Sequence, residues 1–259
     1  IVGSFRFLIE KGFHLIQGLY QGQAHLVRNL FIIGLFYLIV SWLSAKLTRS
    51  EKDIKGSGIP QVEAELKGLM TLNWWSVLWK KYILGILAIA SGLMLGREGP
   101  SIQLGAVGGK GIAKWLKSSP VEERSLIASG AAAGLAAAFN APIAGLLFVI
   151  EEVYHHFSRF FWVSTLAASL VANFVSLLIF GLTPVLDMPD NIPLMTLDQY
   201  WIYLLMGVFL GLSGFLYEKA VLNVGRVYDW VGQTIHLDRA YYPILAFILI
   251  IPVGIFLPQ

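Results

Sequence analysis

The sequence predicts an all-α protein that crosses a membrane several times. Of its 259 residues, 56% are hydrophobic and only 14% are charged, and the mean hydropathy is +0.69. Such a composition is too apolar for an ordinary soluble domain and is typical of a polytopic membrane protein. The chain also contains eight Trp, a residue that concentrates at membrane–water interfaces. Several of its apolar stretches have the length or the period of membrane helices.

Two helices are expected at the start of the chain. Residues 1–20 have a helical period and predict an amphipathic or tilted span, and residues 29–46 predict a clear membrane helix. The loop at residues 46–55 carries four basic residues, whereas the loop at residues 21–28 carries one. Because Lys and Arg concentrate in cytoplasmic loops, this asymmetry places residues 46–55 in the cytoplasm.

The segments that follow are shorter. A short helix is expected after Pro60, and a helix over about residues 76–95 follows an interfacial pair of Trp residues. Three further segments are short for a perpendicular span and are interrupted by Gly, Pro or Asn: residues 100–116, 125–138 and 141–154. Short and interrupted segments are typical of helices that stop partway through the bilayer.

The last third of the chain adds longer spans. Residues 160–182 predict one full-length span, and residues 199–217 and 241–258 predict two more. A loop rich in turn residues is expected over residues 183–198, and a polar connector over residues 218–239 joins the last two spans.

Two segments combine glycines with a proline where a helix begins: Gly56–Pro60 (Gly-Ser-Gly-Ile-Pro) and Gly96–Pro100 (Gly-Arg-Glu-Gly-Pro). Pro suits the first helical position, since its missing N–H would be unpaired there, and glycine lets the backbone approach a ligand closely. A helix N-terminus presents free N–H groups and a partial positive charge, which attract anions. Two such ends in a membrane protein predict an anion site built from broken helices, which indicates ion transport rather than an enzyme.

Glu98 lies between two glycines at the mouth of the second of these helices. A carboxylate there can occupy the positive helix end that an anion also prefers, and it would leave when protonated. Glu98 is therefore a candidate competitor and proton carrier; the alternative is a simple charge that complements the helix dipole. For Arg97, a structural role is favoured over contact with the anion.

Acids and histidines cluster where an apolar run ends. Glu151 and Glu152 point about a hundred degrees apart on a helix, so one can face the interior as a proton entry point while the other meets water. Two solvated acids are the alternative, which the spacing alone favours. His155 and His156 each follow a Glu by four residues, which would permit a metal site. The sequence has no second Glu/His cluster to complete such a site.

Other features narrow the function classes. The chain has no Cys, which excludes thiolate metal sites and Cys nucleophiles, and it has no P-loop, Gly-x-Ser-x-Gly or His-Glu-x-x-His motif. No basic run is interleaved with aromatic residues, so no nucleic-acid partner is expected. The small residues of 128–138 are typical of a packing helix. Lys81, inside an apolar helix, needs an acid partner, and Glu63 is the candidate.

These motifs resemble those of the CLC family of chloride channels and chloride/proton antiporters. Three of them occur in the family's order: Gly56–Pro60, Gly96–Pro100, and the run Gly130–Pro142 that leads into Glu151 and Glu152. The resemblance implies an all-α, CLC-type membrane fold of tilted and broken helices, built from two inverted halves.

The resemblance also implies how much of that fold is present. Residues 1–259 would form a single transmembrane domain, with the first repeat over about residues 1–182 and the start of the second over about residues 183–259. Gly254–Pro258 fits the family's third filter pattern, Gly-x-Phe-x-Pro, but it follows Glu152 by too few helices. We therefore expect a coincidence there, and a fragment that lacks the true third motif and the filter tyrosine.

By the resemblance, the central anion contacts one hydroxyl and several backbone N–H groups, those of Ser57, Gly58, Ile59, Arg97 and Gly99. Glu98 would be the external gating glutamate and Glu152 the internal proton glutamate, and Glu63 and Lys81 would match a buried acid–lysine pair. Family antiporters commonly carry an acid at the position of Glu152, whereas family channels carry an apolar residue. Ser57, rather than Pro, resembles the chloride-selective members.

The resulting interpretation is a chloride/proton antiporter in a plasma or cell inner membrane. Glu98 would alternate between blocking the anion site and carrying a proton, and Glu152 would supply protons from the cytoplasmic side. A passive, voltage- or proton-gated chloride channel of the same fold is the first alternative, and a membrane-embedded metalloprotein is the second. We expect no enzymatic activity, and no cofactor beyond the transported chloride and protons. The resemblance further implies a homodimer through helices around residues 141–153 and 160–182.

Overall fold

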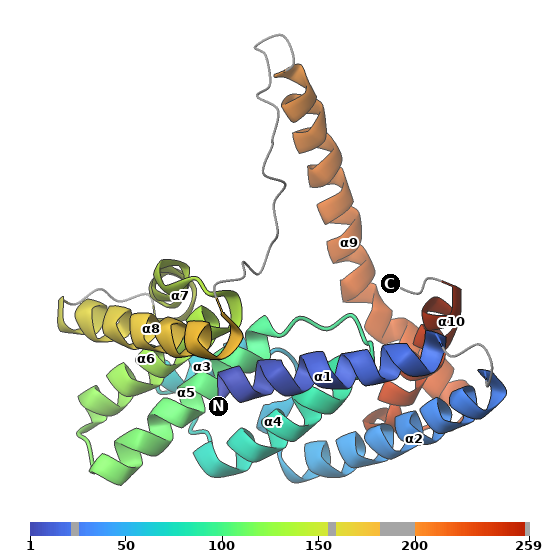
Figure 1. Ribbon diagram of the computed structural model, residues 1–259, viewed down its shortest axis with the longest axis horizontal. Coiled ribbons are helices and arrows are strands. Elements are labelled where there is room, and N and C mark those ends of the chain that lie inside the picture. The colour runs from blue at the N-terminus through green and yellow to red at the C-terminus, as the bar shows by residue number, and fades with distance from the viewer. Residues whose placement is uncertain (22–25, 155–158, 182–199, 257–259) are drawn as a thin grey trace. The chain divides into compact units, whose positions relative to one another are not determined.

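The computed structural model describes residues 1–21, 26–154, 159–181 and 200–256 (Figure 1). The chain divides into two compact units, which are described separately. The first comprises Ile1–Val185 with Pro243–Gln259, and the second comprises Leu186–Tyr242. Every regular element in the described residues is a helix, which confirms the predicted all-α class. The turn-rich loop expected over residues 183–198 lies outside the described residues.

The helices are assigned to the two units as follows. The first unit contains α1 (Val2–Gln21), α2 (Leu26–Ser50), η2 (Lys52–Ile54), α3 (Ile59–Leu66), α4 (Trp74–Ala90), α5 (Glu98–Leu116), α6 (Pro120–Phe139), α7 (Pro142–Phe148), the π-helical turn η3 (Val149–Tyr154), α8 (Arg159–Phe180) and α10 (Pro243–Phe256). The second unit contains α9 (Trp201–Thr234) and η5 (Arg239–Tyr241). Four stretches in the described residues are long and apolar enough to cross a membrane: Val27–Ser50, Arg159–Phe180, Trp201–Thr234 and Arg239–Phe256.

Helix α9 is longer than the sequence predicted. The expected span ended at residue 217 and a polar connector was expected after it, but α9 continues to Thr234. The polar residues beyond the apolar part support the helix with local contacts: Asn223 donates to the carbonyl of Lys219 over 2.6 Å, and Arg226 donates to the Asn223 amide over 2.9 Å. Because pairs three and four residues apart share a helix face, these polar residues extend the helix instead of ending it.

Glycines bring α5 and α6 into close contact. Gly105 and Gly109 on α5 face Gly130 and Gly134 on α6, and a Cβ on any of the four would collide with the backbone of the other helix. Such small residues, four apart on each helix, allow backbones to approach in lipid. The packing role expected for the small residues of α6 is therefore confirmed, and α5, which carries Glu98, is held against a rigid neighbour.

Gly134→Ala is expected to destabilise the folded chain by about 1–3 kcal/mol, because the new Cβ would collide with the carbonyl of Ser101 and the backbone cannot yield as a side chain would. Gly214→Ala, in α9, is the matched control, since nothing lies within 4 Å of a Cβ there. Helix propensity alone makes the control neutral or slightly stabilising. Thermal unfolding in detergent measures both, and equal melting temperatures would contradict the glycine contact.

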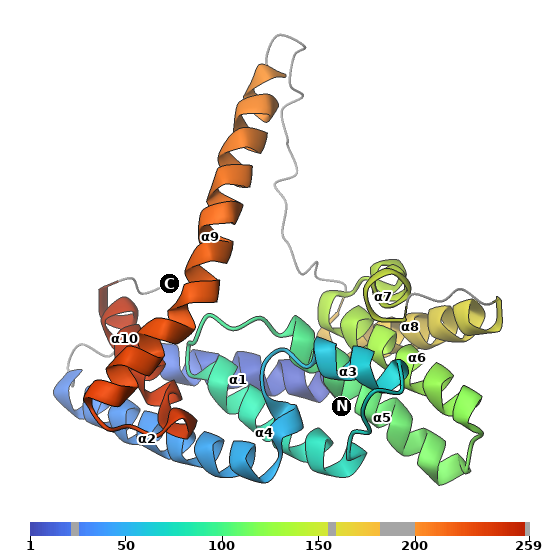
Figure 2. The same cartoon turned by 180° about the vertical axis from the view of Figure 1, so that it is seen from behind.

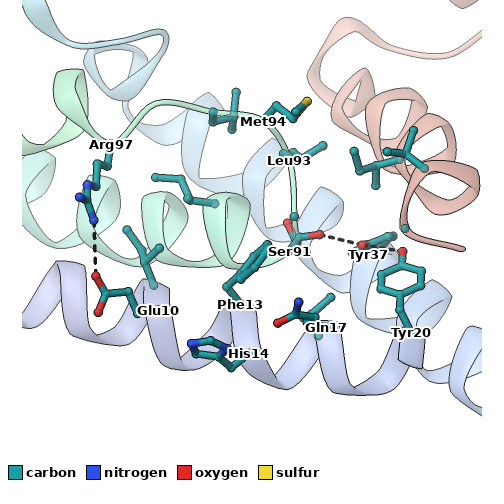
Figure 3. Close-up of a pocket in the computed structure, with 18 of the residues that line it drawn as sticks. Glu10, Phe13, His14, Gln17, Tyr20, Tyr37, Ser91, Leu93, Met94 and Arg97 are labelled. Carbon is teal, nitrogen blue, oxygen red and sulfur yellow. Dashed lines mark hydrogen bonds and ion pairs between the residues drawn. The ribbon is translucent and has the colours of Figure 1, made fainter. Parts of the chain in front are cut away.

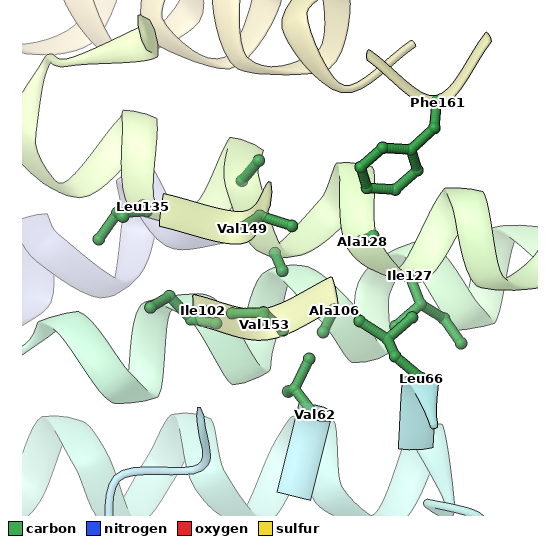
Figure 4. Close-up of a cluster of buried hydrophobic side chains, with 12 residues drawn as sticks. Val62, Leu66, Ile102, Ala106, Ile127, Ala128, Leu135, Val149, Val153 and Phe161 are labelled. Atoms are coloured by element: carbon green, nitrogen blue, oxygen red, sulfur yellow. The ribbon is translucent and has the colours of Figure 1, made fainter. Parts of the chain in front are cut away.

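A cluster of apolar side chains fixes the π-helical turn η3 (Figure 4). Val149 and Val153 are fully buried and pack in one cluster with Val62 of α3. Glu151 and Glu152 lie between the two valines in sequence, and both are exposed. Burial of the valine face therefore turns this acidic pair outward in the described chain, and neither acid is buried inside the first unit.

Candidate functional site

The first glycine segment forms a loop that ends at α3. Gly56 and Gly58 have φ of +68° and +98°, in the left-handed region that favours glycine. Gly58 is the N-cap of α3, Ile59 is its first residue, and Pro60 is its second rather than its first. The missing N–H of Pro60 still costs no hydrogen bond, because the first four N–H groups of a helix have no partner within it.

Ser57 stands at the entrance of α3. Its side chain is exposed, and its hydroxyl accepts a long hydrogen bond of 3.4 Å from the Ile59 N–H. A hydroxyl can donate and accept at once, so this contact leaves the Ser57 proton available to an anion. The free N–H groups of the first turn of α3 point toward the same end of the helix.

Two buried side chains from other helices hold this loop. Lys81 of α4 donates to the carbonyls of Ile54 and Gly56 over 3.0 and 2.7 Å, and Gln103 of α5 donates to the carbonyl of Asp53 over 2.8 Å. Lys81 and Gln103 are 4% and 0% exposed. Three loop carbonyls are thus committed to side chains, which reduces the negative partial charge that the loop can present to an anion.

These contacts correct one expectation. Glu63 and Lys81 were expected to pair, but the ammonium of Lys81 binds backbone carbonyls, and Glu63 forms an ion pair with Lys67 over 2.5 Å. Glu63 and Lys67 are one helical turn apart, so they meet without any tertiary contact. The buried acid–lysine pair in the described chain is instead Glu65 with Lys110, at 2.6 Å.

Asp53 lies in η2, just before this loop. Burial raises its pKa above the ordinary value, and the nearby carboxylates of Glu51 and Glu65 add to the effect.

The second glycine segment leads into α5. Arg97 is the N-cap, Glu98 is the first helical residue, and Pro100 is the third. A Cβ on Gly99 would lie only 2.6 Å from the carbonyl oxygen of Ser57 and 2.7 Å from the Ser57 Cβ. Gly99 is therefore required for this approach, and the two glycine segments are in direct contact. Figure 2 shows α3 against α5 at this junction.

Glu98 faces an open space beside this junction. Its side chain is exposed, and its carboxylate lies over Gly96, where a Cβ would collide with it. It lines a cavity of about 510 Å³ together with residues of α1, α10 and the loop before α5 (Figure 3). An acid placed this way can reach both solvent and the helix N-terminus.

The sequence did not predict three further residues that line this cavity: Glu10, Tyr20 and Tyr37. Arg97 contacts Glu10 of α1 at 3.5 Å, and Tyr37 of α2 donates to the carbonyl of Ser91 over 2.7 Å while its hydroxyl lies 3.0 Å from that of Tyr20 (Figure 3). These residues come from helices far apart in the chain, so no local spacing marks them.

The remaining expected site residues lie apart from the glycine segments in sequence. Glu152 is exposed on η3, as described above. Within the described ranges, no group of three or more His, Cys, Asp or Glu is arranged to hold a metal. His155 and His156, the histidines of the metal alternative, lie outside those ranges. In the third filter pattern, Gly254 contacts the ring of Tyr20 in the cavity wall, and the segment after Phe256 is not described.

Comparison with known proteins gives one consistent family. Residues 9–259 match the model of the family described as voltage gated chloride channel. The H(+)/Cl(-) exchange transporter ClcA of Vibrio vulnificus (strain YJ016) is 40% identical over 177 residues, which are 67% of this chain and 38% of the relative. ClcA of Cronobacter sakazakii is 35% identical over 222 residues, 83% of this chain and 47% of the relative.

Solved structures agree on the fold. The crystal structure of a slow cyanobacterial Cl⁻/H⁺ antiporter matches 99% of this chain and 61% of that chain, with a TM-score of 0.84 and 29% identity. A eukaryotic CLC transporter matches with a TM-score of 0.69 at 20% identity, which supports the fold alone. The matched part of this chain covers less than half of each of the two ClcA relatives.

Proposed function

This chain belongs to the voltage gated chloride channel family, and from that premise we propose that its protein exchanges chloride for protons. It is an integral membrane protein of the bacterial inner-membrane type. The observation that carries the proposal is the contact between Gly99 and Ser57, which brings two helix N-termini together and places Glu98 at the first residue of one of them. Related proteins named as H(+)/Cl(-) exchange transporters support this reading.

In the proposed mechanism, chloride binds where the two helices begin. The Ser57 hydroxyl donates to the anion, and backbone N–H groups around Gly58, Ile59, Arg97 and Gly99 add partial positive charge. Ionised Glu98 competes for the same helix end, and it withdraws into the cavity when it takes up a proton. The ionised carboxylate and the anion thus exclude each other at one position, so uptake of a proton by Glu98 opens that position to chloride and couples the two movements.

We assign the internal proton step to Glu152. Its side chain lies on the surface of η3 rather than in the core of the single chain, and its neighbours Val149 and Val153 fix the turn that carries it. The transport cycle needs no catalysed covalent step and no bound cofactor, so we propose a transporter rather than an enzyme.

We also infer a homodimer through α7, η3 and α8. Helix α8 exposes a row of large apolar side chains, including Phe174 at 62% and Leu178 at 71%, and an apolar partner helix would cover them as lipid would. The molar mass of the detergent-solubilised protein distinguishes a dimer from a monomer covered by lipid.

The remaining proposal concerns the halves of the fold: residues 1–182 correspond to the first inverted repeat, and residues 183–259 begin the second.

A flux experiment on the full-length protein tests exchange. In liposomes with an imposed chloride gradient, wild-type protein is expected to move protons uphill, and Glu152→Gln is expected to lose this proton movement while keeping chloride flux. A neutral amide of the same shape cannot carry a proton.

Glu151→Gln is the matched control, because Glu151 is also exposed on η3, and it is expected to retain both fluxes. Chloride flux without proton movement in the wild type would leave a passive channel as the function. Loss of coupling in both variants would remove the specific role of Glu152.

A further inference from the structure

Two arginines share one carboxylate next to the proposed gate. Glu10 Oε1 on α1 lies 2.9 Å from Nε of Arg6 and 3.5 Å from Nη1 of Arg97. Arg97 directly precedes Glu98, and Figure 3 shows its side chain reaching down from the loop to Glu10. Helix α1 is thereby tied through a single acid to the N-cap residue of α5.

The surroundings of these charges are largely apolar. The guanidinium of Arg6 lies 4.2 Å from the ring centre of Phe180, and that of Arg97 lies 5.9 Å from the ring centre of Phe139. The side chains of Arg6 and Arg97 are 10% and 22% exposed, whereas Glu10 is 42% exposed. The charges of the two largely buried arginines are therefore screened less than surface charges, whereas Glu10 is the exposed member of the group.

We propose that Glu10 is a positioning residue for the gate: it holds Arg97 away from Glu98 and offsets part of the positive charge that would otherwise keep Glu98 ionised. The inference rests on the proposed exchange function, in which Glu98 must take up and release a proton. Without the Glu10 carboxylate, Arg6 and Arg97 would have no acid between them, and the charge of Arg97 would act on Glu98 without being offset.

The other titratable groups in the cavity wall do not replace Glu10. They are His14, Tyr20, Tyr37 and Glu98 itself, with Arg97 opposite. The hydroxyls of Tyr37 and Tyr20 are hydrogen-bonded to each other, and Tyr37 also donates a hydrogen bond to the Ser91 carbonyl. In the part of the chain that the structure describes, Glu10 is the acid in ion-pair contact with Arg97.

The test follows chloride flux against pH in liposomes that contain the full-length protein. Glu10→Gln is expected to shift the pH of half-maximal flux to lower values by about half a unit to one unit, since an unpaired cation beside an acid favours its ionised form. Glu10→Asp keeps the charge and is expected to restore most of the wild-type profile.

Glu123→Gln is the matched control. It also removes an acid from an ion pair, with Lys114 at 3.1 Å, but Lys114 is 16 residues from Glu98 along α5, about 24 Å at 1.5 Å per residue. No shift is expected there. If Glu10→Gln does not fold, Arg97→Gln serves as the second variant, and it is expected to shift the profile to higher pH.

The outcomes separate the inference from the function on which it rests. A Glu10→Gln profile that coincides with wild type, or that falls in height without moving, would overturn the positioning role. A wild-type protein without pH-dependent chloride flux would instead overturn the proposed exchange. A shift in Glu10→Gln that disappears in the double variant Glu10→Gln/Arg97→Gln would support the action through Arg97.

Discussion

Replacing Lys110 with methionine is expected to destabilise the folded chain by about 3–5 kcal/mol, because it leaves a buried carboxylate without its cation. Lys110 Nζ lies 2.6 Å from Glu65 Oε1 and 2.8 Å from the carbonyl of Leu72. The two side chains are only 3% and 8% exposed. Glu65 also accepts the Leu72 N–H over 2.5 Å, so the pair fixes the connection that follows α3.

Thermal unfolding in detergent, followed by tryptophan fluorescence, measures the effect. The double variant Glu65→Gln/Lys110→Met is expected to recover about half of the loss, since Gln removes the charge but still accepts from the Leu72 N–H. Lys67→Met is the control, because its pair with Glu63 is exposed and such pairs contribute about 0–1 kcal/mol. Equal losses of stability in Lys110→Met and Lys67→Met would mean that water reaches the Glu65–Lys110 pair, so that it contributes no more than an exposed pair.

Local patterns predicted most of the helices and the two glycine segments that lead into α3 and α5. The glycines and prolines at Gly56–Pro60 and Gly96–Pro100 mark where α3 and α5 begin, because backbone conformation and missing N–H groups are properties of single residues. The same reasoning failed for α9, where polar residues were taken as a connector although they stabilise one another within a helix.

The pairing of side chains could not be predicted in this way. Lys81 and Glu63 were matched by residue type. In the structure, Lys81 binds the carbonyls of the glycine loop, and the buried ion pair forms between Glu65 and Lys110. Glu10 and Arg97 are 87 positions apart, and neither carries a local signal of the other. Tertiary packing decides which charges meet. The sequence and its family resemblance placed Ser57 and Gly99 at one expected site, and the direct contact between them is seen in the structure.

Glu98→Gln is expected to have the largest functional effect: proton coupling is lost, and the chloride flux that remains no longer depends on pH. The amide has the size of the carboxylic acid but has no charge to exchange for a proton. It therefore cannot alternate between the helix end, where an anion competes with it, and the cavity beside Gly96. Flux and internal pH, recorded together in liposomes with the full-length protein, measure both properties.

Glu122→Gln is the matched control for Glu98→Gln. Glu122 also lies in the first turn of a helix, α6, where its carboxylate closes a capping box by accepting the Ser119 N–H over 2.8 Å. If a negative charge at any helix N-terminus were sufficient, the two variants would behave alike. If Glu98 is the gate, Glu122→Gln keeps pH-dependent, proton-coupled chloride flux. Full coupling in Glu98→Gln would contradict the mechanism, because no other acid in the described structure begins a helix that contacts Ser57.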